Sequence, residues 1–146
     1  MLVWLDESRW EGFLEAGLAH GFHVRVTDAL RFAQRSRVLL MHHEPTGLDV
    51  DIVLGAVPFE EQVVGERVQL TVGDLSIPIS SPENLIIMKA VAHRPRDIGD
   101  IEGLLDTRPE VDRQRVRYWV GEFAKALEAP EILEDLERLL RRREKR

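Results

Sequence analysis

The sequence changes character at one point, between Ile79 and Ser81. Before that point, short apolar runs alternate with turn residues, which is typical of strands with short intervening helices. After it the pattern is helical, and Ser81-Pro82 supplies an N-cap serine with proline at the first helical position. Strands followed by a run of helices indicate an α+β fold, so we predict a mixed β-sheet with flanking helices and then a helical part. We expect one domain over residues 1–146, with a sheet part at 1–79 and a helical part at 80–146.

Within the sheet part, alternating and continuous apolar runs predict six strands. They cover 2–5, 22–26, 37–42, 48–54, 68–72 and 76–79. The turn residues of Glu44-Pro45-Thr46-Gly47 join the third and fourth runs into a hairpin, and Gly73-Asp74 joins the last two. Two helices are expected, one with an apolar stripe starting at Trp10 and one over 57–65.

Pro95 divides the stretch from Leu85 to Leu105. A proline inside a helix removes a backbone hydrogen bond, so we predict two helices with a corner at His93-Arg94-Pro95. Further helices are expected over 111–127 and from Glu131 to the chain end. The last carries an apolar stripe that could pack on its own domain or serve as a docking surface; it consists of Ile132, Leu133, Leu136, Leu139 and Leu140.

Composition limits the classes of protein to consider. The 146 residues carry a formal net charge of -6 and no cysteine, which argues against a non-specific nucleic-acid binder, a disulfide framework or a thiolate metal site. No apolar run approaches the ~20 residues of a membrane span, and we expect a cytoplasmic protein without a membrane partner. A basic tail ends the chain, either as a solvated helix end or as an RNA or phosphate contact; it comprises Arg141, Arg142, Arg143, Lys145 and Arg146.

Asp49 and Asp51 are two residues apart in a predicted strand, so they share one face of it. Leu48, Val50 and Ile52 occupy the opposite, apolar face. Paired carboxylates of this kind suit a hard cation such as Mg²⁺. An ordinary amphipathic strand with a solvated polar side also explains the pattern, and the pattern by itself favours that interpretation over a metal site.

Charged residues gather around the predicted corner. Lys89 shares a helix face with His93 at i, i+4, and Asp97 shares one with Asp100 at i, i+3 on the next helix. Lysine and arginine beside carboxylates could hold a triphosphate together with a metal. The alternative is a structural corner in which Arg96 pairs with Asp100 and Lys89 is the exposed edge of its helix.

Two blocks of the sequence carry a resemblance to a known family. Residues 47–54 read GLDVDIVL, and residues 79–105 read ISSPENLIIMKAVAHRPRDIGDIEGLL. Their order and spacing resemble the minimal nucleotidyltransferases of the toxin–antitoxin type, the AbiEii-like group. Those proteins typically run G-x-x-V-D-I/L-I/L and then V-x-S-P/L-E-D/N-L-I/L-x-x-K-x-x-A-x-R-x-K/R-D-x-x-D-I/V. The resemblance extends over most of the chain, from the first strand to about Leu105.

The resemblance implies a reaction: transfer of a nucleotidyl group from a nucleoside triphosphate to an RNA or protein acceptor, with Mg²⁺. Asp51 matches a carboxylate that acts as base or metal ligand, and Lys89 matches the lysine that contacts the triphosphate. Asp49 has no required counterpart and would be an added metal ligand. The implied site residues are Asp51, Lys89 and Asp97 as catalytic, Lys89, Arg94, Arg96 and Asp100 as nucleotide-binding, and Asp49 and Asp51 as metal-binding.

One part of the family pattern has no match. The family signature begins with a Gly-Ser helix start and a D-x-D strand, whereas the matching strand here opens as Met1-Leu2-Val3-Trp4-Leu5-Asp6. Transfer with two metals needs ligands on both sides of the phosphate. We therefore consider three functions: an enzyme completed by upstream residues or a partner chain, a catalytically incomplete module that binds nucleotide, RNA or protein, and a half-domain that dimerises through an exposed edge.

Overall fold

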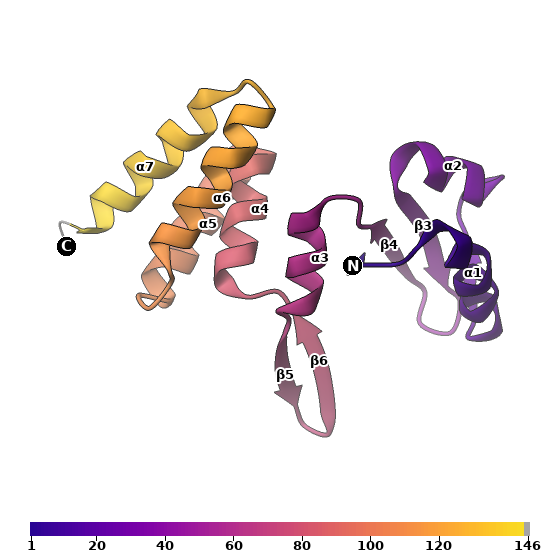
Figure 1. Cartoon of the computed structure of the whole chain (residues 1–146). Coiled ribbons are helices and arrows are strands. Elements are labelled where there is room, and N and C mark those ends of the chain that lie inside the picture. Colours follow the sequence, from indigo (N-terminus) through magenta and orange to yellow (C-terminus); the bar gives the residue numbers. More distant parts are fainter. Residues whose placement is uncertain (145–146) are drawn as a thin grey trace. The chain divides into compact units, whose positions relative to one another are not determined.

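A computed structural model of the chain describes residues 1–144. The chain forms two compact units, Met1–Glu66 and a second unit that begins at Arg67 (Figure 1). Mixed α and β structure, with a four-stranded sheet, flanking helices and C-terminal helices, confirms the predicted fold class. The boundary between the units differs from the expected change at residue 80, because the second hairpin belongs to the same compact unit as the helices.

The first unit is built around one sheet with the strand order β1-β4-β3-β2, in which β1 is parallel to β4 and the other pairs are antiparallel. Its elements are β1 (Leu2–Val3), η1 (Glu7–Arg9), α1 (Trp10–Ala19), β2 (Phe22–Val24), α2 (Ala29–Ser36), β3 (Val38–His43), β4 (Leu48–Leu54) and α3 (Pro58–Gly65).

The β3–β4 hairpin gives the sheet two unlike faces. Its register pairs Leu39 with Ile52 on one face and His42 with Asp49 on the other. Alternation along each strand therefore separates an apolar face from a polar one. The apolar face is buried against α1 and α2, and its core residues are Trp10, Ala29, Ala33, Leu39, Met41, Ile52 and Leu54.

Helix α2 was not predicted. It is a short helix with as many polar as apolar residues, and only Ala29 and Ala33 of them are buried. The segment is strongly amphipathic, so its periodicity does indicate a helix, and the two alanines one turn apart allow close packing on the sheet. The strands β1 and β2 are also shorter than predicted, ending at Val3 and Val24.

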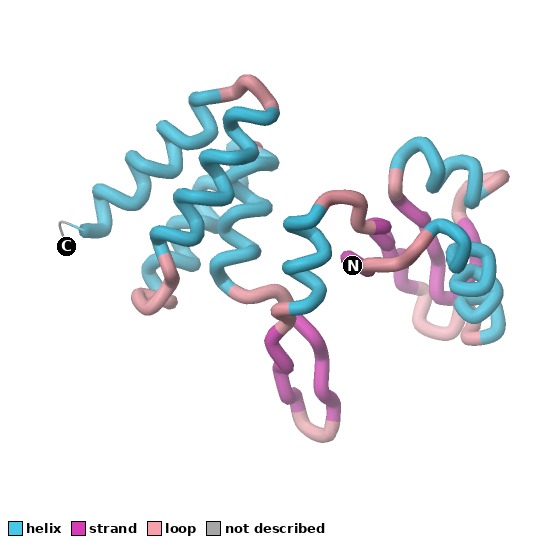
Figure 2. Tube along the Cα trace, viewed as in Figure 1, coloured by secondary structure: helices cyan, strands magenta, loops and turns pink. Residues whose placement is uncertain are grey.

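The second unit consists of a hairpin and a helical bundle (Figure 2). Helix α4 packs against the three helices that follow it. The elements are β5 (Val68–Val72), β6 (Leu75–Ile79), α4 (Pro82–Ala92), α5 (Pro95–Thr107), α6 (Arg113–Ala126) and α7 (Pro130–Glu144).

The apolar stripe of α7 packs within its own unit. Ile132, Leu136, Leu139 and Leu140 are all buried, and Leu133 is half-buried. The stripe is therefore core rather than a docking surface. By contrast, the β5–β6 hairpin has exposed apolar side chains on its cross-strand pairs, namely Val68, Leu70, Val72, Leu75, Ile77 and Ile79.

The predicted corner between α4 and α5 is confirmed. The Ser81 hydroxyl caps α4 by accepting a hydrogen bond from the backbone amide of Asn84, 3.2 Å away. His93 ends α4 in the left-handed region, at φ 49°. Arg94 is extended, as the residue before a proline prefers to be, and Pro95 begins α5. The corner brings the last turn of α4 beside the first turns of α5.

None of the described helices is both long enough and apolar enough to cross a membrane.

Helix α4 supplies a test of the packing. Ile87 is fully buried in the helical unit, whereas Leu75 on the hairpin is 66% exposed. We expect Ile87→Ala to destabilise this unit by about 2–5 kcal/mol, because it removes buried methyl groups and leaves a cavity. Leu75→Ala should change the free energy of unfolding by no more than about 0.5 kcal/mol. Urea unfolding followed by circular dichroism measures both, and equal effects would contradict this packing.

Candidate functional site

The α4–α5 corner brings four of the predicted site residues into one charged network. Lys89 Nζ lies 2.5 Å from Asp100 Oδ2 and 3.4 Å from Asp97 Oδ1. Arg94 donates to both oxygens of Asp97, from Nε at 2.5 Å and from Nη2 at 3.0 Å. This cluster, which we call the corner network, consists of Lys89, Arg94, Asp97 and Asp100.

Asp97 lies at the centre of the corner network and is only 1% exposed. A buried carboxylate is stable only when it is paired and hydrogen-bonded. The hydrogen bond from Arg94 is the main reason that the pKa of the Asp97 carboxyl falls from 3.8 to about 2. In the same way, the hydrogen bond to Asp100 raises the pKa of Lys89, and the bond to Asp97 raises the pKa of Arg94.

Arg96 does not join the corner network. It is exposed in the first turn of α5 and makes no ion pair with another described residue. The alternative pairing of Arg96 with Asp100 is therefore wrong, because Asp100 bonds Lys89 across the corner instead. Arg96 is oriented toward solvent, where it could still meet an anionic ligand.

His93 connects the corner to α7, a contact that the sequence does not reveal. Its Nε2 donates to Asp135 Oδ2 at 3.0 Å, and Asp135 also pairs with Arg138. Lys89 and His93 line a narrow gap of about 10 Å³ together with Ile98, Asp135 and Leu139. The corner network therefore lies at the edge of the space between α5 and α7.

The Glu83-Asn84 pair of the second sequence block has a structural role. Asn84 is fully buried, and its Oδ1 accepts a hydrogen bond from Arg115 Nη2 at 2.9 Å. The Glu83 carboxylate accepts a hydrogen bond from the backbone amide of Asp112 at 3.2 Å. Both contacts tie the start of α4 to the region around the start of α6, which holds in place the helix that carries Lys89.

Asp49 and Asp51 lie in the first unit, on the polar face of the sheet, as the strand alternation predicts. Arg25 pairs with both carboxylates, at 3.0 Å from Asp49 and in a shorter contact with Asp51. His42 Nδ1 donates to Asp49 Oδ1 at 2.7 Å, which is the main reason that the pKa of Asp49 lies below its ordinary value. Arg25 was not predicted as a partner, because it lies 24 residues from Asp49 in the chain and carries no local signal of the contact.

This arrangement does not fit a metal site as it stands. The guanidinium of Arg25 already bonds one oxygen of each carboxylate, and His42 bonds the other oxygen of Asp49. In the part of the chain that the structure describes, no group of three or more His, Asp or Glu residues could hold a metal ion. Magnesium binding by Asp49 and Asp51 therefore remains a prediction, and it requires the Arg25 side chain to move.

The opposite face of the same sheet has a different character. An apolar cavity of about 460 Å³ lies there, between the sheet and α1. Phe13, Leu14, Met41, Val50 and Ile52 are among the side chains that line it. Strand alternation directs Asp49 and Asp51 away from this cavity, so it is not part of the predicted metal site.

The buried carboxylate predicts a pH effect. Because folding lowers the pKa of Asp97 to about 2, the ionised form stabilises the fold above about pH 4, and this contribution is lost as the pH falls through about 2. We expect Asp97→Asn to unfold at a lower urea concentration at pH 7. The difference in urea midpoint between the variant and the wild type should become smaller as the pH falls from about 4 to about 2. Asp74→Asn in the exposed β5–β6 turn is the control. A difference in urea midpoint that does not change with pH would contradict the stabilising role of the ionised Asp97 carboxylate.

The polar face of the sheet predicts a competition between Arg25 and a cation. We expect Arg25→Ala to strengthen Mn²⁺ binding, used as a probe for Mg²⁺, by about tenfold, since unit charges 4 Å apart repel by about 1–4 kcal/mol near a protein surface. Paramagnetic resonance of free Mn²⁺ measures the affinity, and Glu44→Ala is the control. Undiminished binding in an Asp49→Ala, Asp51→Ala double variant would disprove the metal site.

Comparison of the sequence with models of protein families and with curated proteins found no match. The resemblance to nucleotidyltransferases therefore remains an expectation that depends on the two sequence blocks.

Proposed function

We propose that this chain is a nucleotidyltransferase-type protein. In this proposal it binds a nucleoside triphosphate and transfers a nucleotidyl group to an RNA or protein acceptor, as one component of a toxin–antitoxin pair in the cytoplasm. The observation that carries the proposal is the corner network, in which Lys89, Arg94, Asp97 and Asp100 make direct contacts. These are residues of the second block on which the resemblance depends.

Within this proposal, the network residues have different roles. Lys89 contacts the triphosphate, since its side chain is one-fifth exposed and its partner Asp100 is half-exposed. Arg94 is also half-exposed and can contact the ligand beside it. Asp97 is buried, so it acts as a positioning residue that holds Lys89 and Arg94 rather than as a group that touches substrate. Arg96, on the solvent side of the same corner, meets the outer phosphates.

Binding has an electrostatic condition. The two cations of the corner network face two carboxylates, so the network carries no excess positive charge. A triphosphate must therefore replace Asp100 as the partner of Lys89, which is feasible because Asp100 is the exposed member of the pair. A magnesium ion carried by the triphosphate would offset its negative charge beside Asp100.

A second candidate function is a binding module without transfer. The pairing of Arg25 with both Asp49 and Asp51 favours it, because the carboxylates that would hold Mg²⁺ already have an arginine as their partner. Transfer with two metals would also need carboxylates beyond this pair. A second copy of the chain or a partner protein would have to supply them.

Calorimetry tests nucleotide binding. We expect ATP, GTP, CTP or UTP to bind in the presence of Mg²⁺, and Lys89→Ala to weaken binding about tenfold or more, because a hydrogen bond to a charged group contributes about 1.5–3 kcal/mol. Lys125→Ala is the matched control, since Lys125 is an exposed lysine paired with Glu122 on α6. Absence of binding for all four nucleotides would contradict the proposal.

A labelled nucleotide then separates the two functions. Incubation of α-labelled triphosphates with an RNA pool, and with a total protein extract, detects transfer as label on the acceptor. Transfer that is lost in Lys89→Ala supports the enzyme. Binding without transfer to either acceptor supports the module.

A further inference from the structure

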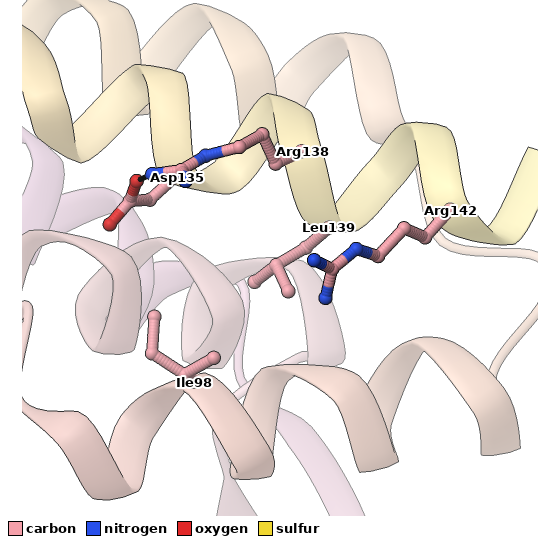
Figure 3. A pocket seen from close by; sticks show the side chains of 5 residues that line it. All are labelled: Ile98, Asp135, Arg138, Leu139 and Arg142. Carbon is pink, nitrogen blue, oxygen red and sulfur yellow. Dashed lines mark ion pairs between the residues drawn. The ribbon is translucent and has the colours of Figure 1, made fainter.

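The space between α5 and α7 forms a pocket of about 150 Å³ within the helical unit. Figure 3 shows the five side chains that line it: Ile98 from α5, and Asp135, Arg138, Leu139 and Arg142 from α7. Ile98 and Leu139 form an apolar wall, while Arg138 and Arg142 lie one turn apart on α7. The lining of the pocket thus combines an apolar wall with the side chains of two arginines.

The charges in this pocket do not cancel. Asp135 is its one carboxylate, and it already pairs with Arg138 and accepts a hydrogen bond from His93. Arg142 is exposed and makes no ion pair with another described residue. In Figure 3 its side chain runs back along Leu139 toward the space between α7 and α5. A positive charge without an ion-pair partner among the described residues therefore faces the pocket.

The size of the pocket limits its ligand. Pockets that enclose a drug-sized molecule measure about 300–1,000 Å³, so a space of about 150 Å³ admits a group smaller than a whole nucleotide. Guanidinium groups match the oxygens of carboxylates and phosphates with paired hydrogen bonds. Because Arg138 already pairs with Asp135, an added anion would contact mainly Arg142, and an anion with several oxygens matches the paired donors of its guanidinium.

We propose that the pocket between α5 and α7 is a phosphate-binding subsite, in which Arg142 is the principal contact and Arg138 the second. The subsite adjoins the corner network, since Ile98, Asp135 and Leu139 line both this pocket and the gap beside Lys89. The phosphate belongs either to a polyphosphate or to the backbone of a nucleic acid. The subsite requires no nucleotidyl transfer, so it stands or fails separately from the proposed function.

The chain contains a matched control for this proposal. Arg141 is exposed on the same turn of α7, and its removal changes the net charge and the helix-dipole interaction as the removal of Arg142 does. Arg141 does not line the pocket. Any difference between Arg142→Ala and Arg141→Ala therefore reports on the pocket rather than on the overall charge of the basic tail.

The experiment uses two probes with the full chain at low salt. Inorganic tripolyphosphate is titrated by calorimetry, and fluorescein-labelled oligouridylate by fluorescence anisotropy. We expect Arg142→Ala to lower the affinity for at least one probe about tenfold or more. Arg141→Ala should change the same affinity less than about threefold. Arg142→Lys should restore only part of the affinity, because lysine lacks the paired donors. Circular dichroism confirms that each variant is folded.

The outcomes separate the sources of the phosphate. If Arg142→Ala loses affinity only for tripolyphosphate, the subsite binds a polyphosphate ligand. If it loses affinity only for oligouridylate, the subsite binds a nucleic-acid backbone. Equal weakening by both alanine variants would overturn the proposal in favour of diffuse attraction to the tail. Absence of binding for both probes would also overturn it. Neither probe carries a nucleoside triphosphate, so failure of nucleotide binding at Lys89 would leave this test intact.

Discussion

The helical unit depends on one buried charge. Asp97 is almost fully removed from solvent, and a lone carboxylate there would be strongly destabilising without partners. Arg94 and Lys89 supply those partners from the corner and from α4. The bonds thereby fix where α5 starts relative to α4, and they hold Lys89 at the edge of the space between α5 and α7. The same interaction serves packing and positions the candidate ligand contact.

The two candidate sites share an electrostatic feature, since each set of charges is compensated within its own unit. Arg25 pairs with both Asp49 and Asp51, and the carboxylates of the corner network neutralise Lys89 and Arg94. A ligand at either site must exchange for a protein partner rather than enter an open charged pocket. Arg142 differs because it has no ion-pair partner among the described residues, and this difference motivates the phosphate subsite.

Much of the candidate site was accessible from the sequence. The i, i+4 and i, i+3 spacings with Pro95 between them predicted two helices and a charged corner, and Lys89, Arg94, Asp97 and Asp100 do meet there. Contacts between residues distant in the chain could not be predicted from the sequence. Arg25, 24 residues from Asp49, and Asp135, 42 residues from His93, carry no local signal of their contacts. Helix α2 was missed although its residues are amphipathic, because a segment of eight residues is short for a periodic pattern.

The sequence by itself determined the local elements of this protein: the strand alternation that gives the sheet a polar and an apolar face, the caps and prolines that begin the helices, and the corner at His93. These follow from neighbouring residues, whose backbone preferences and periodicity act over a few positions. Only the tertiary structure decided which charges are compensated, that the hairpin β5–β6 belongs to the helical unit, and that Arg142 faces a pocket with Ile98. Those outcomes depend on packing between segments far apart in the chain, and local sequence patterns do not encode such distances.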